Sequence, residues 1–109
     1  MANIFKNAFA VNVNHAAYAV LYTAPASTTT VVLGLAICNK TGNSVDISVQ
    51  VQDAGSTAYQ VLDTVSVPGR TTLEVLAGQK YVLETTDVLR VKAGSANSID
   101  CSIGIMEIT

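Results

Sequence analysis

Two stretches decide the fold of this 109-residue chain: Val31-Val32-Leu33-Gly34-Leu35-Ala36-Ile37-Cys38 and Val45-Asp46-Ile47-Ser48-Val49-Gln50-Val51-Gln52-Asp53. In the second stretch the odd positions are apolar as far as Val51, and the even positions are polar. This alternation indicates a β-strand with one buried and one solvated face, because successive side chains of a strand point to opposite sides. The second stretch is therefore predicted to be a strand that buries Val45, Ile47, Val49 and Val51.

The first stretch is apolar on both faces, and the two faces differ in side-chain size. Its odd positions are large, whereas three of its even positions are Gly34, Ala36 and Cys38. A strand with two apolar faces is typically covered on both, so we expect another surface to lie over the small side chains. The polar loop of residues 39–44 contains Gly and Asn, which favour chain reversal. This loop predicts that the two strands form a hairpin.

Length and composition predict a single domain with few charges. Half of the residues are apolar and 13% are charged, whereas about 25% is usual for a globular protein. A surface with so few charges is expected to be rich in Ser, Thr and Asn and to be covered in part by partners. The six basic residues are scattered along the chain, but a surface that binds nucleic acid needs several cations together. We therefore expect no nucleic-acid partner.

The N-terminal region lacks the features of a secretion signal, because polar residues such as Asn12 and His15 interrupt any hydrophobic segment. No apolar stretch reaches the length that is needed to cross a bilayer. We therefore expect a soluble protein that is made in a cytoplasm and has no membrane partner. In that compartment Cys38 and Cys101 are expected to be free thiols. A disulfide between them is the less favoured alternative, and it would require their strands to be neighbours.

Six more segments show strand patterns, separated by turn signals such as Pro25 and Pro68-Gly69. In one segment Leu62 breaks the alternation, which predicts a β-bulge near Asp63-Thr64. In the last segment the apolar residues occupy odd positions up to Ile105 and even positions from Met106 onward. This change predicts a bulge or a strand that passes from one layer to the other. The six segments are Ala17–Thr23, Ala58–Val67, Thr71–Leu76, Tyr81–Glu84, Val88–Ala93 and Ile99–Ile108.

The first 17 residues are less regular than the rest. Four of their large apolar residues occupy odd positions, as in a strand: Phe5, Phe9, Val11 and Val13. Residues 1–17 are therefore interpreted either as an edge strand or as an arm that reaches a neighbouring subunit. Residues 18–109 are interpreted as a single domain. With seven to nine short strands and no helical periodicity, the chain is predicted to be all-β, an antiparallel β-sandwich of the jelly-roll or immunoglobulin-like type.

The residues that most catalytic sites need are sparse. His15 is the sole histidine, no Gly-x-Ser-x-Gly motif presents a serine, and the acidic residues form no calcium-loop pattern. The two cysteines are not in a Cys-x-x-Cys pair and have no basic neighbour that would activate a thiol. We therefore expect no enzymatic activity and neither metal nor cofactor. Four tyrosines without a tryptophan leave carbohydrate binding as a weaker hypothesis.

A characteristic succession of strands and turns runs through two regions of the chain. The first is Leu21-Tyr22-Thr23-Ala24-Pro25-Ala26-Ser27-Thr28-Thr29-Thr30-Val31-Val32-Leu33-Gly34-Leu35, followed by Asn39, a polar turn and Val45-Asp46-Ile47-Ser48-Val49. The second runs from Leu76-Ala77-Gly78-Gln79-Lys80-Tyr81 to Met106-Glu107-Ile108-Thr109. Together these regions resemble small structural proteins of tailed bacteriophages, cyanophages among them. The resemblance covers residues 18–109, implies a virion component and carries over no catalytic residue.

The resemblance and the low charge together predict a capsid decoration, or cement, protein. It would bind the lattice of the major capsid protein as a homo-oligomer, expected to be a trimer, and would stabilise the shell of the virion. The alternative is a tail, neck or fibre component, with carbohydrate or receptor binding as a third hypothesis. The candidate interface combines N-terminal aromatic residues, one face of the strand at residues 31–38 and C-terminal apolar residues: Phe5, Phe9, Val32, Gly34, Ala36, Met106 and Ile108.

Overall fold

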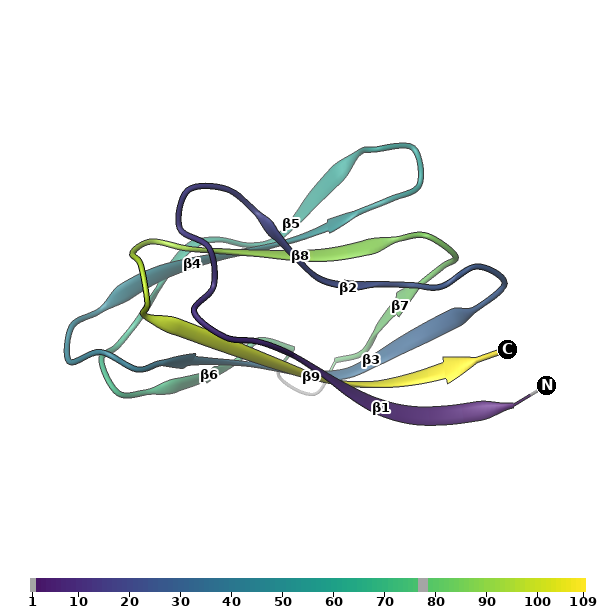
Figure 1. Cartoon of the computed structure of the whole chain (residues 1–109), viewed down its shortest axis with the longest axis horizontal. Coiled ribbons are helices and arrows are strands. Elements are labelled where there is room, and N and C mark those ends of the chain that lie inside the picture. The colour runs from purple at the N-terminus through teal and green to yellow at the C-terminus, as the bar shows by residue number, and fades with distance from the viewer. Residues whose placement is uncertain (1, 77–78) are drawn as a thin grey trace.

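The computed structural model describes residues 2–76 and 79–109 and consists of two antiparallel β-sheets packed face to face (Figure 1). The predicted all-β antiparallel sandwich is confirmed. Within the described residues there is no helix of the length and apolar character that a membrane span needs. The described strands are β1 (Asn3–Ala10), β2 (Ala19–Thr23), β3 (Thr29–Asn39), β4 (Val45–Gln52), β5 (Ala58–Val67), β6 (Thr72–Glu74), β7 (Tyr81–Leu83), β8 (Val88–Ala93) and β9 (Ile99–Ile108).

The order of the strands decides between the two sandwich types that the sequence left open. Sheet 1 has the order β1-β9-β3-β6, with β7 also paired to β3, and sheet 2 has the order β2-β8-β4-β5. Sheet 2 is the upper layer in Figure 1 and sheet 1 is the lower layer. Apart from β4–β5 and β6–β7, each pair of consecutive strands is split between the two sheets. This order is that of a jelly roll.

The core lies between the sheets and is built from alternate residues of the long strands. In β4, Val45, Ile47 and Val49 are buried and Asp46 is exposed, as the alternation predicted. Val51, predicted to be buried with them, is half-buried against the core. Stiff β-branched side chains dominate this core and suit the close packing of two pleated surfaces. The largest fully buried apolar side chains are Leu35, Ile37, Ile47, Leu83, Ile99, Ile103, Ile105, Val32, Val49, Val67 and Val91.

The predicted hairpin between β3 and β4 is wrong. β3 pairs with β9, β6 and β7 in sheet 1, whereas β4 pairs with β5 and β8 in sheet 2. Each of the two strands has one buried face, and these faces meet across the core, so the strands do not lie side by side. The loop of residues 40–44 therefore crosses from one sheet to the other, and the hairpin of this region joins β4 to β5.

The crossing after β3 is held by Asn39, whose side chain is buried. Its Nδ2 donates hydrogen bonds to the main-chain carbonyls of Asn43 at 2.8 Å and Val67 at 3.0 Å. Its Oδ1 accepts hydrogen bonds from the amide and the hydroxyl of Thr41, at 2.9 and 2.8 Å. One side chain thus joins the crossing to the end of β5 and supplies hydrogen-bond partners to backbone groups of both segments.

The β-bulge predicted near Asp63-Thr64 is confirmed. The register of β5 against β4 shifts between Val65 and Leu62, and Thr64 lies in the left-handed region with a φ of 53°. A β-branched residue rarely adopts this conformation. Because of the extra residue in the bulge, Leu62 and Val65 both lie on the core-facing side of β5, although one has an even number and the other an odd number. This explains why Leu62 departs from the alternation of its strand.

A second bulge, which the sequence did not predict, lies in β3 between Val32 and Gly34. It leaves Leu33 exposed and lets Val32 and Leu35 both face the core. Uninterrupted alternation would have placed all the odd, large residues of this strand on the buried face. The bulge therefore turns Val31 toward the outer face of sheet 1, against that expectation.

The predicted change of phase in the last strand is also wrong. In β9 every odd-numbered residue is buried over the whole length of the strand. Glu107 therefore points inward, and Met106 and Ile108 point outward. Glu107 has polar partners inside the sandwich, because its carboxylate accepts a hydrogen bond from the Tyr22 hydroxyl and lies 3.0 Å from the Lys6 ammonium. A buried charge that is paired and hydrogen-bonded does not force the strand to turn over.

The N-terminal segment forms the edge strand of sheet 1. β1 pairs with β9 over eight residues without a register shift and runs along the lower margin of Figure 1. Beyond β1, Asn12 has a φ of 50°, and Val13 enters the core. Edge placement is one of the two interpretations given above for this segment, and contact with a neighbouring subunit stays a prediction.

Candidate interface on the outer face of sheet 1

The strand register sets side chains in rows across the outer face of sheet 1. The first row is apolar and crosses β1, β9, β3 and β7: Phe5, Met106, Val31 and Val82. The second row crosses β1, β9, β3 and β6: Phe9, Ser102, Ala36 and Glu74. A middle row of small residues lies between them: Asn7, Gly104 and Gly34.

Two aromatic side chains project from this face. Phe5 is 71% exposed and Phe9 is 73% exposed. Single exposed apolar residues are ordinary on protein surfaces, but a contiguous apolar patch marks an interaction site. Phe5 forms such a patch with Met106, Val31 and Val82 in the first row, and Phe9 projects from the second row beyond the middle row. We call this whole outward side of sheet 1 the outer face.

The middle row forms a hollow between the two aromatic rings. A Cβ at Gly34 would have no atom of the described chain within 4 Å, and a Cβ at Gly104 would meet the Asn7 Oδ1 at an ordinary 3.6 Å. The adjoining hollow has a volume of about 290 Å³. Neither glycine has a positive φ, and glycine in a strand costs about 0.5–1 kcal/mol relative to alanine. The empty space fits insertion of a side chain from another molecule.

The outer face carries little charge. Among the described strands of sheet 1, the ionisable acidic and basic side chains directed outward are Glu74 and Asp100. Asp100 is already engaged, because it accepts a hydrogen bond from the Asn12 amide at 2.9 Å and lies 3.0 Å from the Lys40 ammonium. These contacts hold the pKa of Asp100 below its usual value. A partner of the outer face would therefore meet mainly apolar and small side chains.

Six of the seven residues predicted for the interface lie on this face. Val32 is the exception, because it is 1% exposed and faces the core. The bulge between Val32 and Gly34 places these two residues on opposite faces of the sheet, although both have even numbers. Val32 therefore belongs to the core and not to the interface. Contact of the other six with a partner stays a prediction. They are Phe5, Phe9, Gly34, Ala36, Met106 and Ile108.

Sequence reasoning missed three apolar residues of the outer face. An unbroken alternation would place Val31 and Leu33 on the same side as the buried Leu35 and Ile37, but the bulge in β3 brings both of them outward. Val82 lies in the short strand β7, between half-buried Tyr81 and buried Leu83. Alternation over these three residues was the one sequence signal for an outward Val82, and a pattern of three residues is too short to predict the face of a strand.

Cys38 and Cys101 lie on neighbouring strands but on opposite faces of sheet 1. Cys38 is opposite Asp100 on the outer face, whereas Cys101 is opposite Ile37 and points into the core. Both thiols are free, and burial raises the pKa of Cys101 to about 12. A bond between them would require one strand to turn over, which excludes the disulfide alternative for this fold.

The inner side of β1 is anchored by a polar cluster. The side chain of Glu107 is 7% exposed, accepts a hydrogen bond from the Tyr22 hydroxyl at 2.5 Å and lies 3.0 Å from the Lys6 ammonium. The Tyr22 hydroxyl is also 2.9 Å from that of Thr30. Burial and the nearby carboxylate raise the pKa of Tyr22 to about 12, while hydrogen bonds from Tyr22 and Lys6 hold the pKa of Glu107 low. The cluster fixes which side of β1 faces outward.

Stability is expected to fall at acid pH, and Glu107→Gln should reduce that fall. The pKa of Glu107 is lower in the folded chain than its ordinary value of 4.5, so the unfolded chain binds more protons just below that pH. Stability from this group is therefore present above pH 4.5 and is lost as the pH falls through the folded pKa. Thermal unfolding between pH 7 and about pH 3 measures the slope.

A residual acid slope should remain in Glu107→Gln, because the pKa of Asp100 is also lowered in the folded chain. Asp100→Asn is the matched variant that removes this second contribution. Equal slopes for the wild type and Glu107→Gln would contradict the assignment of the buried carboxylate.

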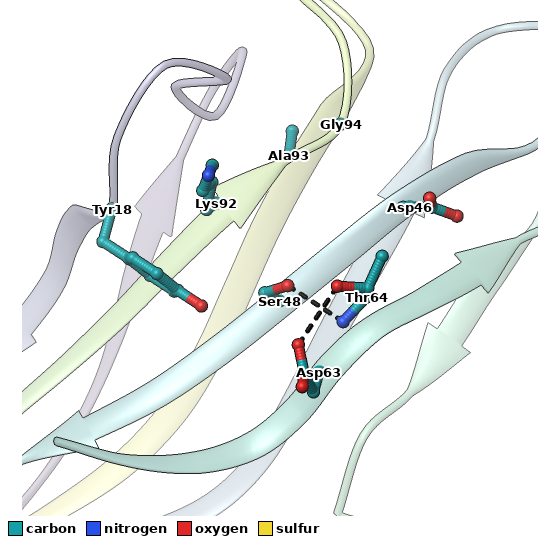
Figure 2. A pocket seen from close by; sticks show the side chains of 8 residues that line it. All are labelled: Tyr18, Asp46, Ser48, Asp63, Thr64, Lys92, Ala93 and Gly94. Carbon is teal, nitrogen blue, oxygen red and sulfur yellow. Dashed lines mark hydrogen bonds between the residues drawn. The ribbon is translucent and has the colours of Figure 1, made fainter.

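A second hollow, of about 270 Å³, lies on the outer face of sheet 2 around the Thr64 bulge (Figure 2). The Thr64 amide donates a hydrogen bond to Ser48 Oγ at 3.0 Å, and its hydroxyl donates one to Asp63 at 3.1 Å. Figure 2 shows Tyr18 and Lys92 on the opposite side of this hollow. Its hydroxyl, carboxylate and ammonium groups can hydrogen-bond a polar ligand. Within the described residues, no group of three or more His, Cys, Asp or Glu side chains could hold a metal ion.

Comparison with known proteins finds similarity in structure. No family model and no curated protein matches the sequence. The chain is similar to one in the Bacillus endospore appendages, a novel family of disulfide-linked pili, with a TM-score of 0.59 and 13% identity over 98% of this chain and 88% of that one. It is also similar to a chain in the acid-stable capsid of Helicobacter pylori bacteriophage KHP30, with a TM-score of 0.53 and 12% identity over 100% of this chain and 89% of that one. At these identities the likeness shows the fold.

Proposed function

We propose that the chain is a structural protein of a bacteriophage virion, which acts through contact and catalyses no reaction. In the most specific form of the proposal it is a capsid decoration protein that binds the major capsid protein lattice through the outer face and stabilises the shell. The observation that carries the proposal is the outer face itself. Two exposed phenylalanines lie on either side of a row of small residues. The hollow at this row has Glu74 as its one charged lining side chain and lies on the surface of a two-layer scaffold.

The likeness of fold supports a role in assembly. The two similar chains belong to a pilus and to a phage capsid, and the likeness spans nearly the whole of this chain in both cases. The resemblance of residues 18–109 to structural proteins of tailed phages favours a virion over a pilus. Together they support a small building block that joins larger assemblies.

The size of the outer face favours attachment of several copies together. Full burial of one phenylalanine contributes about 1.5–3 kcal/mol, so Phe5 and Phe9 would together supply about 3–6 kcal/mol. Association itself costs an estimated 4–15 kcal/mol in lost freedom, which leaves little net affinity for one copy. Linked copies bind a lattice far more tightly than single ones. We therefore propose that the chain acts as a homo-oligomer, with a trimer as the form expected from the sequence analysis.

Binding to shells is the test of this function. Purified chain is mixed with capsid shells that were assembled without it, from the phage that encodes it. The wild type is expected to co-sediment in high copy number and to raise the temperature at which the shells disassemble. The double variant Phe5→Ser/Phe9→Ser should lose both effects, because it removes the two projecting rings without touching the core.

Val20→Ser is the matched control, since it also replaces an exposed apolar side chain, on β2 of the other sheet. It should bind and stabilise shells as the wild type does. Shells that ignore the wild-type chain, or that bind the double variant equally well, would refute the decoration role. Binding only at the tail or neck, in low copy number, would favour the alternative placement as a tail, neck or fibre component.

The polar hollow around Thr64 is the place where the third hypothesis, carbohydrate or receptor binding, would apply. Its groups can hydrogen-bond hydroxyls, and the Tyr18 ring lies beside it with the Arg90 guanidinium 5.3 Å from its centroid. This hollow and the outer face belong to different sheets. Receptor binding and lattice binding would therefore use opposite sides of the molecule.

A further inference from the structure

β1 differs from the other edge strands of the two sheets. An open strand edge presents unpaired N–H and C=O groups, and proteins normally block it with short strands, bulges or charges. β2 has five residues and a register shift, β5 has the Thr64 bulge, and β6 and β7 have three residues each. Among the described edge strands, β1 alone has eight residues in unbroken register, and its one charged residue, Lys6, is paired with Glu107.

The hydrogen bonds between β1 and β9 show which backbone groups of β1 remain free. The Thr109 amide donates to the Ala2 carbonyl at 3.0 Å, so these residues form a hydrogen-bonded pair. In an antiparallel ladder, such pairs alternate with pairs that are not hydrogen-bonded. The even-numbered residues of β1 therefore bond to β9, and the odd-numbered residues direct their N–H and C=O groups away from it. The free residues are Asn3, Phe5, Asn7 and Phe9.

We propose that this free edge pairs antiparallel with β1 of a second copy of the chain. Head-to-tail pairing would need a second open edge on the same molecule, and the other described edges carry the blocking features named above. The equivalent strand of another copy is then the matching partner, so the contact is two-fold and isologous. The proposal concerns how two copies join, and it does not depend on the assignment to a shell. A two-fold contact closes with two copies, so it gives a dimer in place of the trimer named above, and a trimeric mass in the experiment below would overturn it.

Side chains select the register of the pairing. With Asn7 on the two-fold axis, each Phe5 lies opposite Phe9 of the second copy, and Lys6 lies opposite Ala8. Aromatic pairs across strands are favourable. An axis at Lys6 would set two ammonium groups opposite each other, which is unfavourable. An axis at Phe5 would leave both Phe9 rings without a cross-strand partner.

The proposed pairing joins the two copies of sheet 1 into one continuous sheet. All four phenylalanine rings then lie on the same outer side, because odd-numbered residues of β1 face outward. Each copy contributes one hollow, at its Gly34 and Gly104, and the two hollows lie on either side of the four phenylalanine rings. A dimer of this form offers one uninterrupted outer face of twice the area.

Opposite charges at Asn7 test both the contact and its axis. Asn7 is exposed, and in the proposed dimer two copies of this residue are about 5.5 Å apart between Cα atoms. Asn7→Lys and Asn7→Asp should each raise the dimer dissociation constant tenfold or more through like-charge repulsion. An equal mixture of the two variants should restore association as a heterodimer. Sedimentation equilibrium up to about 1 mM covers the range of a weak interface of this size.

Two further variants separate loss of pairing from loss of folding. Asn7→Ser should dimerise as the wild type does, because it keeps the backbone groups and adds no charge. Asn7→Pro removes the outward amide but no bond to β9, so it should be monomeric with an unchanged circular dichroism spectrum. In the wild type, the amides of Phe5 and Phe9 should exchange more slowly with solvent as the concentration rises.

A wild type that stays monomeric at about 1 mM would overturn the proposal. So would Lys and Asp variants that associate like the wild type, or a mixture that associates no better than either variant alone.

Discussion

Val49→Asp is expected to abolish folding. The Val49 side chain has no exposed surface and faces the core from the middle of β4. Transfer of an unpaired carboxylate into such an environment costs more than the ~5–15 kcal/mol by which domains of this kind are stable. The variant should give no cooperative thermal transition and a circular dichroism spectrum without the β-sheet signal.

Val20→Asp is the matched control, because it makes the same chemical change in sheet 2 at a position that is 61% exposed. Substitutions at exposed sites usually change stability by about 0.5 kcal/mol or less, so this variant should unfold near the wild-type temperature. A soluble, cooperatively folding Val49→Asp protein would mean that β4 turns its other face to the core.

Asn39→Ala is expected to lower the free energy of unfolding by about 3–5 kcal/mol. The substitution removes the hydrogen bonds to the carbonyls of Asn43 and Val67 and those from Thr41. Each buried polar group left without a partner costs about 1–3 kcal/mol, and water can reach some of these groups because Asn43 is exposed. The midpoint of urea unfolding measures the change.

The loops around Asn39 have little freedom to close over a smaller side chain. A Cβ at Gly69 would lie 2.5 Å from the carbonyl of Gly42, so the two loops are already in close contact. Asn43→Ala is the control, since Asn43 contributes its main-chain carbonyl and its side chain is exposed. It should change stability by about 0.5 kcal/mol or less. Equal losses in the two variants would contradict the role assigned to Asn39.

The features of the fold that could be predicted are those with a local signal. The alternation of Val45, Ile47 and Val49 predicted a buried strand face, and the break at Leu62 predicted the bulge. The choice of partner strand has no such signal. A polar loop after Asn39 suits a hairpin and a crossing between sheets equally well, and the difference depends on contacts with distant residues such as Val67.

The candidate interface was predictable in part for the same reason. Small residues at Gly34 and Ala36 marked one face of β3, and the structure places that face outward. The face of Val32 was not predictable, because the bulge after it changes which residues point to the core. In a run where every residue is apolar, no break in the sequence pattern reveals such a bulge. The inward position of Glu107 was hidden because its partner Lys6 is about a hundred residues away in the sequence.

The pairing of β1 with β9 also bears on synthesis of the chain. Ribosomes add about 5–20 residues per second, and the partner of β1 begins at Ile99. The nascent N-terminal strand therefore waits for several seconds without a neighbour in its own sheet. During that time both of its backbone edges are open beside the two phenylalanine rings, which stay exposed in the folded chain as well. During that interval a chaperone that shields extended apolar segments would protect it from coaggregation with other newly made chains.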